Sequence, residues 1–529
     1  MSSRLARSAG LIGIATMASR LLGVAREIVL ARIFGASETP AMDAFNVAFR
    51  VPNLVRDLFA EGAMTAAFVP TFTRTLQGRG REAAWRLGNL VINALLIATG
   101  LIVVAGIVFA DPITRTIASG VEFASVPGKL ELTTQLTRIM MPFLTTVAVA
   151  VAVMGMLNAL HQFFLPAISP AMFNVATILC AFLLVPLMPS VGLPPIAGIA
   201  IATVLGGLGQ IAVQWPALRK EGFRYRPILD FRDPGVREIL RLMGPGTLGL
   251  AAVQINVLVN TSLATTEPQG AVSWLQYAFR LMYLPIGLFG VSIATAALPD
   301  LSKHAAAADR NAMRRTISTG LRLMLMLNVP ATIGLIVLAQ PIVELLLEYG
   351  RFTPHDTAST AAALMFYSPG LLGYSAVKIA SPSFYSMGDS RTPAVVSVAS
   401  IGVNLVLNIM LVQIMGYRGL ALGTAIAAMV NASSLLYLLG RRLDGLDRRR
   451  IAVSFGKILV ASLLMGAASH FAALWLTNAV PSQEWYWRAV RVSGAIGAGV
   501  VVLMGSARAL AIAEFNDALS QITRRFVRR

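Results

Sequence analysis

Arginine side chains lie in the middle of long apolar segments of this chain, where a charge is costly. The segment LIGIATMASRLLGVAREIVLARIFG contains Arg20, Arg26 and Glu27, and the segment VSWLQYAFRLMYLPIGLFGV contains Arg280. A charge at bilayer depth costs roughly a few kcal/mol or more, and it normally faces a bundle interior or a wet cavity. The pattern therefore predicts a cationic chamber inside a membrane protein, and such a chamber would bind an anion.

A third segment, MDAFNVAFRVPNLVRDLFAEGAMTAAFVP, carries an ordered polar stripe. Its polar residues recur at intervals of three and four, which places them on one face of a helix: Asp43, Asn46, Arg50, Asn53 and Asp57. Arg56 and Glu61 flank this stripe. A guanidinium group makes bidentate hydrogen bonds to phosphate oxygens and stays charged when partly buried. Several arginines around a hydrated chamber would therefore hold a diphosphate without a metal.

A purely structural interpretation competes with substrate binding at some of these positions. Arg26 and Glu27 are adjacent, as are Arg56 and Asp57, and such pairs could lock helices together by pairing across them. Arg50 fits either interpretation. Lys378, in GYSAVKIASP, is a lone charge that either extends to the membrane interface or closes a gate.

Composition defines the elements that must position these side chains. Hydrophobic residues make up 56% of the chain and charged residues 13%, against about 25% charged in soluble domains. Since a membrane-spanning helix needs about 20 apolar residues, we predict an all-α polytopic membrane protein with fourteen spans. They cover about 9–34, 42–70, 84–110, 132–157, 166–188, 195–218, 238–262, 270–298, 315–341, 357–387, 392–414, 418–440, 452–477 and 486–512.

The net charge of +19 follows the predicted topology. Basic runs such as TRTLQGRGREAAWR, RRLDGLDRRR and the tail TRRFVRR fall on one side of the spans. Because Lys and Arg accumulate in cytoplasmic loops, both termini are predicted to be cytoplasmic, and nucleic-acid binding is disfavoured. No G-x-x-x-x-G-K-[ST] loop occurs, so we expect no ATP hydrolysis within the chain and no covalently bound cofactor. Transport would depend on the membrane potential or on a coupling ion (Na⁺, H⁺ or Cl⁻).

The chain repeats itself at an offset near 230 residues. AFR at 48–50 recurs at 278–280, and GIAIAT at 198–203 matches GLALGT at 419–424. Two six-helix lobes are predicted, related by a pseudo-two-fold axis along the membrane normal, with a site at their interface. We predict an N-lobe over 1–219, a C-lobe over 220–441, and two further helices with a basic tail over 442–529. The connection 219–237 is long enough for a surface amphipathic helix.

Long signatures in these segments resemble the MurJ (MviN) lipid II flippases. They are SRLLGVAREIVLARIFG, DAFNVAFRVPNLVRDLFAEGAMTAAFVP, GAVSWLQYAFRLMYLPIGLFGVSIATAALPDLSK, VELLLEYGRFT and VKIASPSFYSMGDSRTP. The resemblance implies the multidrug/oligosaccharidyl-lipid/polysaccharide exporter superfamily, with lobes that alternate between inward- and outward-open states. It implies a bacterial cytoplasmic-membrane transporter, not an enzyme, that carries undecaprenyl-diphosphate-MurNAc-pentapeptide-GlcNAc (lipid II) to the outer leaflet. We expect the chain to be monomeric, with membrane lipids and cell-wall synthesis proteins as its other partners.

The resemblance also assigns roles to particular residues. The family's essential residues match Arg20, Arg26, Arg56, Arg280 and Asp43, and matches of lesser weight are Asn53, Glu61 and Ser273. In the family the last two spans form a groove suited to the lipid tail. The chain departs from the family pattern at Phe279 and Tyr283, where relatives can have acids, and at Asp57, where many have a second basic residue.

Three other functions compete with lipid II transport. A flippase for another polyprenyl-diphosphate-linked glycan would use the same arginines. A multidrug antiporter would favour carboxylates and aromatic residues in the chamber. A polytopic glycosyltransferase would need a sizeable aqueous loop with catalytic carboxylates, and no connection here is long enough.

Overall fold

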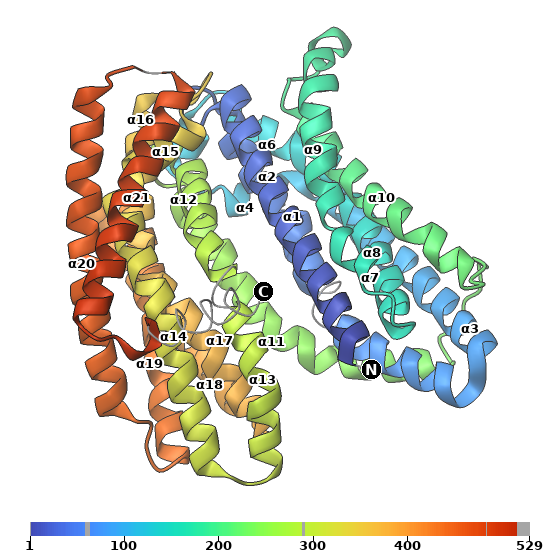
Figure 1. Cartoon of the computed structure of the whole chain (residues 1–529). Coiled ribbons are helices and arrows are strands. Elements are labelled where there is room, and N and C mark those ends of the chain that lie inside the picture. Colours follow the sequence, from blue (N-terminus) through green and yellow to red (C-terminus); the bar gives the residue numbers. More distant parts are fainter. Residues whose placement is uncertain (1, 59–63, 288–290, 483, 516–529) are drawn as a thin grey trace. The chain divides into compact units, whose positions relative to one another are not determined.

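The computed structural model describes residues 2–58, 64–287, 291–482 and 484–515, and within these ranges it contains helices and no strand. Glu61 and the basic tail 523–529 lie outside the described residues. The chain forms two compact units (Figure 1). Unit 1 comprises Met1–Ser273 with Tyr349–Thr353, and unit 2 comprises Trp274–Glu348 with Pro354–Arg529.

Unit 1 contains eleven α-helices and one 3₁₀ helix among its described residues. They are α1 (Ser2–Phe34), α2 (Ala41–Arg56), α3 (Met64–Val108), α4 (Ala110–Ile117), α5 (Val121–Ser125), α6 (Lys129–Met140), α7 (Phe143–Ala159), α8 (Phe164–Ile168), α9 (Ala171–Leu183), η2 (Val185–Val191), α10 (Ala197–Lys220) and α11 (Pro234–Ala264). Helix α3 packs on α7 and α11, and α1 packs on α9. The core of unit 1 is rich in aromatic side chains, including Phe68, Phe72, Trp85 and Phe223.

Helix α12 (Ala271–Pro285) begins in unit 1 and continues in unit 2. Unit 2 further contains α13 (Val291–Ala306), α14 (Arg310–Val337), α15 (Ala339–Leu347), α16 (Pro354–Tyr367), α17 (Gly370–Ser386), α18 (Arg391–Met415), α19 (Tyr417–Arg442), α20 (Arg448–Ala479) and α21 (Trp485–Ala509). The last two helices lie side by side, and α20 also packs on α14 (Figure 1).

Eight of the described helices are long and apolar enough to cross a membrane, or nine if the bent pair α9–η2 forms one span. These helices are compatible with the prediction of fourteen spans, but the exact number of spans stays a prediction. One boundary differs from expectation. The segment α3, Met64–Val108, consists of two helices that meet at a kink at Gly80 (φ +83°), so the helices extend further into the connection predicted near 71–83 than expected.

Two pairs of helices recur at the offset of the predicted repeat. Helix α2 begins at Ala41 and α12 at Ala271, a difference of 230, and α7 and α17 each contain 17 residues after a proline. However, α11, which the repeat assigns to the second copy, packs on α3 and α4 within unit 1. The boundary between repeats near residue 220 and the boundary between compact units at Ser273 are therefore different.

The expectation of an amphipathic helix over 219–237 is wrong. Helix α10 ends at Lys220, α11 begins at Pro234, and residues 223–230 have no regular structure. Asn89 and Asn93 of α3 explain the difference, because their side-chain amides donate to the carbonyl oxygens of Arg224 and Arg226 at 3.0 and 2.8 Å. These side chains satisfy backbone groups that a helix would otherwise pair.

A short strap returns from the second half of the sequence into unit 1. Its residues are Tyr349–Thr353, and the Arg351 amide donates to the carbonyl oxygen of Arg32 at 3.0 Å. Gly35 (φ +68°) and Gly350 (φ +63°) allow this approach. A Cβ on Gly35 would lie 2.3 Å from the carbonyl oxygen of Arg351, and a Cβ on Gly350 would lie 2.2 Å from that of Arg32. Both positions therefore require glycine for space and for backbone conformation.

Close packing between α17 and α19 yields a stability prediction. A Cβ on Gly373 would lie 2.5 Å from the backbone carbon of Ala428, so Gly373→Ala is expected to force the two helices apart. The expected loss is about 1–3 kcal/mol of the free energy of unfolding, measured as a lower unfolding temperature in detergent. Gly402→Ala in α18, where a Cβ meets open space, is the control and should be neutral. Equal stability of both variants would contradict this packing.

The start of α18 yields a pH prediction. Asp389 accepts hydrogen bonds from the amide and hydroxyl of Thr392 at 3.0 and 2.7 Å, and also pairs with Arg442. Hydrogen bonding by Thr392, followed by Arg442, lowers the pKa of Asp389 to about 2. A depressed pKa stabilises the fold above the ordinary carboxyl pKa, and this contribution is lost as the pH falls through about 2. Asp389→Asn should lower the unfolding temperature at pH 7, and the difference from the parent should shrink below pH 4. A difference independent of pH would exclude the carboxylate charge as its cause.

Candidate functional site

The first arginine cluster lies on α1 where it packs against α9. Arg26 and Glu27 are 8% and 7% exposed, and the Arg26 Nε donates to the Glu27 carboxylate at 3.1 Å. The Arg26 guanidinium also lies 5.0 Å from the ring centre of Phe173, which holds its plane by a cation–π contact. Arg20 is half-buried on the same helix. This arrangement keeps Arg26 charged and fixed in orientation at a buried position.

The second cluster lies at the end of α2. Arg56 donates to Asp57 Oδ1 through Nε at 3.1 Å and Nη2 at 2.8 Å, and both side chains are about one quarter exposed. Asn53 and Gln254 donate to the other oxygen of Asp57 at 3.3 and 3.1 Å. Asp57 is thus a fixed counter-ion, and Gln254 attaches it to α11. In both clusters the carboxylate forms an ion pair with the arginine next to it in sequence.

The third cluster surrounds Asp43, whose carboxylate is 1% exposed and accepts four hydrogen bonds. Lys129 Nζ and the Gly270 amide donate to Oδ2 at 3.0 and 2.8 Å. The amide and hydroxyl of Ser273 donate to Oδ1 at 3.0 and 2.7 Å. Asn46 in turn donates to the Ser273 hydroxyl at 3.2 Å. The carboxylate therefore joins α2 to α6 and to the first turn of α12.

The sequence predicted Asp43 and Ser273 separately, and the structure brings them together. Lys129 was not predicted. It is 1% exposed, and its ammonium lies 4.3 Å from the ring centre of Phe123. A signal was available, since Lys129 is one of few cations in a predicted outer connection, directly before an apolar segment. A lone lysine there indicates a specific partner.

In unit 2, Arg280 is half-buried on α12 and follows Phe279, which belongs to a cluster of aromatic side chains. The Phe279 ring lies 5.7 Å from that of Tyr283 and 5.5 Å from that of Tyr367, and Tyr283 lies 6.2 Å from Tyr374. The two residues that depart from the family pattern thus belong to one aromatic cluster. Aromatic packing therefore involves both positions where the resemblance led us to expect acids.

The remaining candidates are less organised. Arg50 is half-buried on α2, and Lys378 is exposed on α17, which fits an extended side chain better than a buried gate. Within the described ranges, no group of three or more His, Cys, Asp or Glu side chains has a metal-binding arrangement.

The chain is similar to known proteins in both sequence and fold. Residues 30–486 match the family model for "Lipid II flippase MurJ". A probable lipid II flippase MurJ of Vibrio cholerae is 35% identical over 512 residues, covering 94% of this chain and 95% of that protein. The lipid II flippase MurJ of Burkholderia cenocepacia is 35% identical over 465 residues, covering 87% and 88%.

The chain belongs to the MurJ lipid II flippase family.

Solved structures agree with this assignment. A MurJ structure described as inward closed has a TM-score of 0.76 at 26% identity and covers 95% of this chain and 99% of its own. A structure described as an inward-facing multidrug resistance MATE family transporter of the MOP superfamily has a TM-score of 0.69 at 16% identity, covers 82% of this chain and 99% of its own, and supports the fold alone. Like the MurJ family, the chain is a multi-span membrane transporter and not an enzyme.

Proposed function

We propose that this chain moves lipid II from the inner to the outer leaflet of the bacterial cytoplasmic membrane by alternating access. The observation that carries the proposal is the pairing of buried or half-buried arginines with adjacent carboxylates on α1 and α2, in a chain of the MurJ family. The diphosphate is the part of lipid II that these guanidinium groups would recognise.

The paired carboxylates suit a carrier better than bare arginines would. A site that only attracted phosphate would bind the substrate and retain it, whereas transport requires both entry and release. Glu27 and Asp57 each hold a guanidinium group in place and compete with phosphate for its donors. Arg20, Arg26, Arg56 and Arg280 are the proposed diphosphate-binding residues.

Asp43 is proposed to act differently from the arginines. Its four hydrogen bonds saturate a carboxylate that is 1% exposed. We assign it to the joint that ties α2 to α6 and α12, with Ser273 as a second member of that joint. Opening and closing of the transport pathway would require this joint to form or break.

The proposed topology places both termini and the basic connections in the cytoplasm, by the positive-inside rule. The membrane potential is the proposed driving force, since each charge that crosses 100 mV contributes about 2.3 kcal/mol. Which coupling ion takes part is a separate question, which replacing Na⁺ or Cl⁻ in a transport assay addresses.

Complementation tests the proposed substrate. The resident lipid II flippase of a bacterium is depleted, this chain is expressed, and growth is scored together with the accessibility of lipid II at the outer leaflet. Rescue of both is expected. If a well-expressed chain restores neither, a flippase for another polyprenyl-diphosphate-linked glycan becomes the better assignment, because the same arginines would bind any diphosphate.

A further inference from the structure

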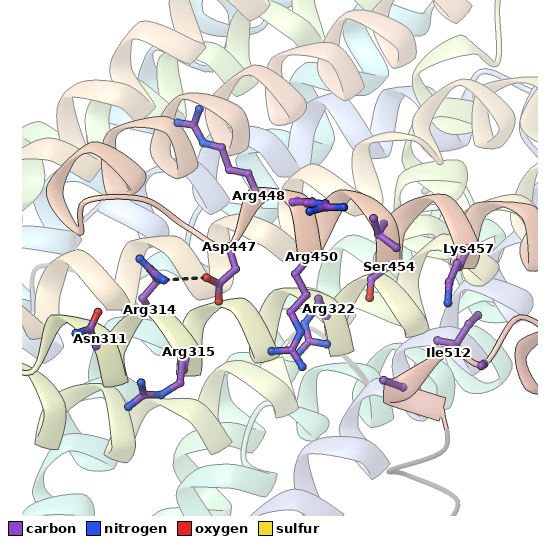
Figure 2. A pocket seen from close by; sticks show the side chains of 14 residues that line it. Asn311, Arg314, Arg315, Arg322, Asp447, Arg448, Arg450, Ser454, Lys457 and Ile512 are labelled. Carbon is purple, nitrogen blue, oxygen red and sulfur yellow. Dashed lines mark ion pairs between the residues drawn. The ribbon is translucent and has the colours of Figure 1, made fainter.

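A cationic cavity of about 700 Å³ lies within unit 2, between the beginning of α14, the beginning of α20 and residues 511–513. Figure 2 shows side chains from these three segments around it. Seven lining residues are Arg or Lys, and the acidic lining residue is Asp447. None of the proposed diphosphate-binding residues lines this cavity. Its volume lies within the range of ligand pockets, roughly 300–1,000 Å³.

The positive charge of this cavity is only partly balanced. Arg314 lies 3.2 Å from Asp447 (Figure 2), and Arg322 donates to Glu514. Within the part of the chain that the structure describes, no carboxylate forms an ion pair with the other basic lining residues, which are Arg315, Arg448, Arg449, Arg450 and Lys457. The cavity therefore has a strong electrostatic preference for an anion.

One lining residue has a buried donor that lacks a partner. Arg322 lines the cavity and is 8% exposed, and its Nε has no hydrogen-bond partner among the described residues. Buried polar groups in native proteins normally have a partner. The guanidinium plane, fixed by Glu514, can present its remaining donors to oxygen atoms in the cavity.

The surface beside the cavity indicates that the anion belongs to a lipid. Val453 and Lys457 line the cavity, and Val460 and Leu464 continue from them at intervals of three and four along one face of α20. The three apolar side chains are 53%, 49% and 50% exposed. A cationic cavity that continues into an exposed apolar stripe suits an amphiphile with a phosphate head and a hydrocarbon chain.

We infer that this cavity binds the phosphate-bearing headgroup of a membrane lipid, with its chain along the α20 stripe. On the proposed topology the lipid lies in the cytoplasmic leaflet. The headgroup chemistry has two sources, an anionic phospholipid and a polyprenyl diphosphate, and both would be held by charge-assisted hydrogen bonds from the arginines. The binding test below requires no transport, so its result is independent of the proposed function.

The test uses the full chain, purified in detergent, stripped of lipid and measured by native mass spectrometry. The probes are phosphatidylglycerol, phosphatidylcholine, undecaprenyl diphosphate and inorganic pyrophosphate. The triple variant Arg315→Gln/Arg450→Gln/Lys457→Gln removes three cavity cations, and single Arg450→Gln serves if the triple variant is unstable. The control, Arg219→Gln/Lys220→Gln/Arg224→Gln, removes the same charge from exposed positions in unit 1.

We expect the triple variant to bind phosphatidylglycerol or undecaprenyl diphosphate about tenfold more weakly than the parent and the control. Phosphatidylcholine binding should not change. A loss confined to phosphatidylglycerol supports a resident phospholipid, and one confined to undecaprenyl diphosphate supports a docking site for the transported lipid. Equal binding by parent and triple variant, equal losses in both variants, or binding of pyrophosphate as tight as that of the lipids would each overturn the inference.

Discussion

Arg26→Ala is expected to reduce lipid II transport by about 100-fold or more and to abolish complementation. A bidentate arginine–phosphate contact comprises two charge-assisted hydrogen bonds, each contributing about 1.5–3 kcal/mol. The substitution also leaves Glu27, which is 7% exposed, without the guanidinium it now pairs with. Transport and stability must therefore be measured separately, as outer-leaflet lipid II and as the unfolding temperature at matched membrane levels.

A double variant separates the two roles of Arg26. Arg26→Met/Glu27→Gln removes both buried charges and should recover much of the stability that Arg26→Ala loses. If Arg26 binds diphosphate, this double variant is stable and inactive. Recovery of transport in the double variant would show that Arg26 serves only to balance Glu27. Arg219→Ala, at an exposed position, is the control for loss of one arginine and should transport normally.

Asp43→Asn is expected to destabilise unit 1 by about 3–5 kcal/mol, because it leaves the Lys129 ammonium, 1% exposed, without a counter-charge. Lys129→Met should have a comparable effect through the orphaned carboxylate. The double variant Asp43→Asn/Lys129→Met should be more stable than the sum of the two single losses predicts. Thermal unfolding of the four proteins in detergent measures this coupling, with exposed Asp300→Asn as the control.

Transport by the same variants tests the proposed joint. If Asp43 acts by joining α2 to α6 and α12, the stable double variant remains impaired, because the charged connection between these helices is gone. Additive losses of stability would contradict a specific Asp43–Lys129 pair. Full transport by Asp43→Asn would contradict the joint itself.

The sequence predicted the class of the protein and the repeat because both follow from local and periodic signals. Charges in apolar segments are costly enough that they identify functional helices without any structure. The offset of 230 that relates two AFR motifs also relates Asp43 to Ser273, and those two residues are hydrogen-bonded. The polar faces of two apolar segments and the family resemblance predicted both residues, but they did not predict their contact.

What the sequence did not predict depends on packing between distant segments. Lys129 meets Asp43 across 86 positions of sequence, and its rotamer and depth are set by α6 packing on α2. Residues 223–230 do not form a helix because Asn89 and Asn93 bind their carbonyl oxygens, an effect that no local propensity contains. Likewise, the cationic cavity of unit 2 combines residues from 311 to 513, so only the fold reveals it.

The strap at Tyr349–Thr353 has a consequence for the ancestry and dissection of the protein. With the repeat boundary near residue 220, unit 1 contains two stretches of the second copy, which are residues 220–273 and the strap Tyr349–Thr353. A gene divided between residues 273 and 274 would therefore encode a first product that lacks its own Gly350 contact to Arg32. A division after Thr353 would instead separate Trp274–Glu348 from the rest of unit 2, so no single division of the chain leaves both compact units whole.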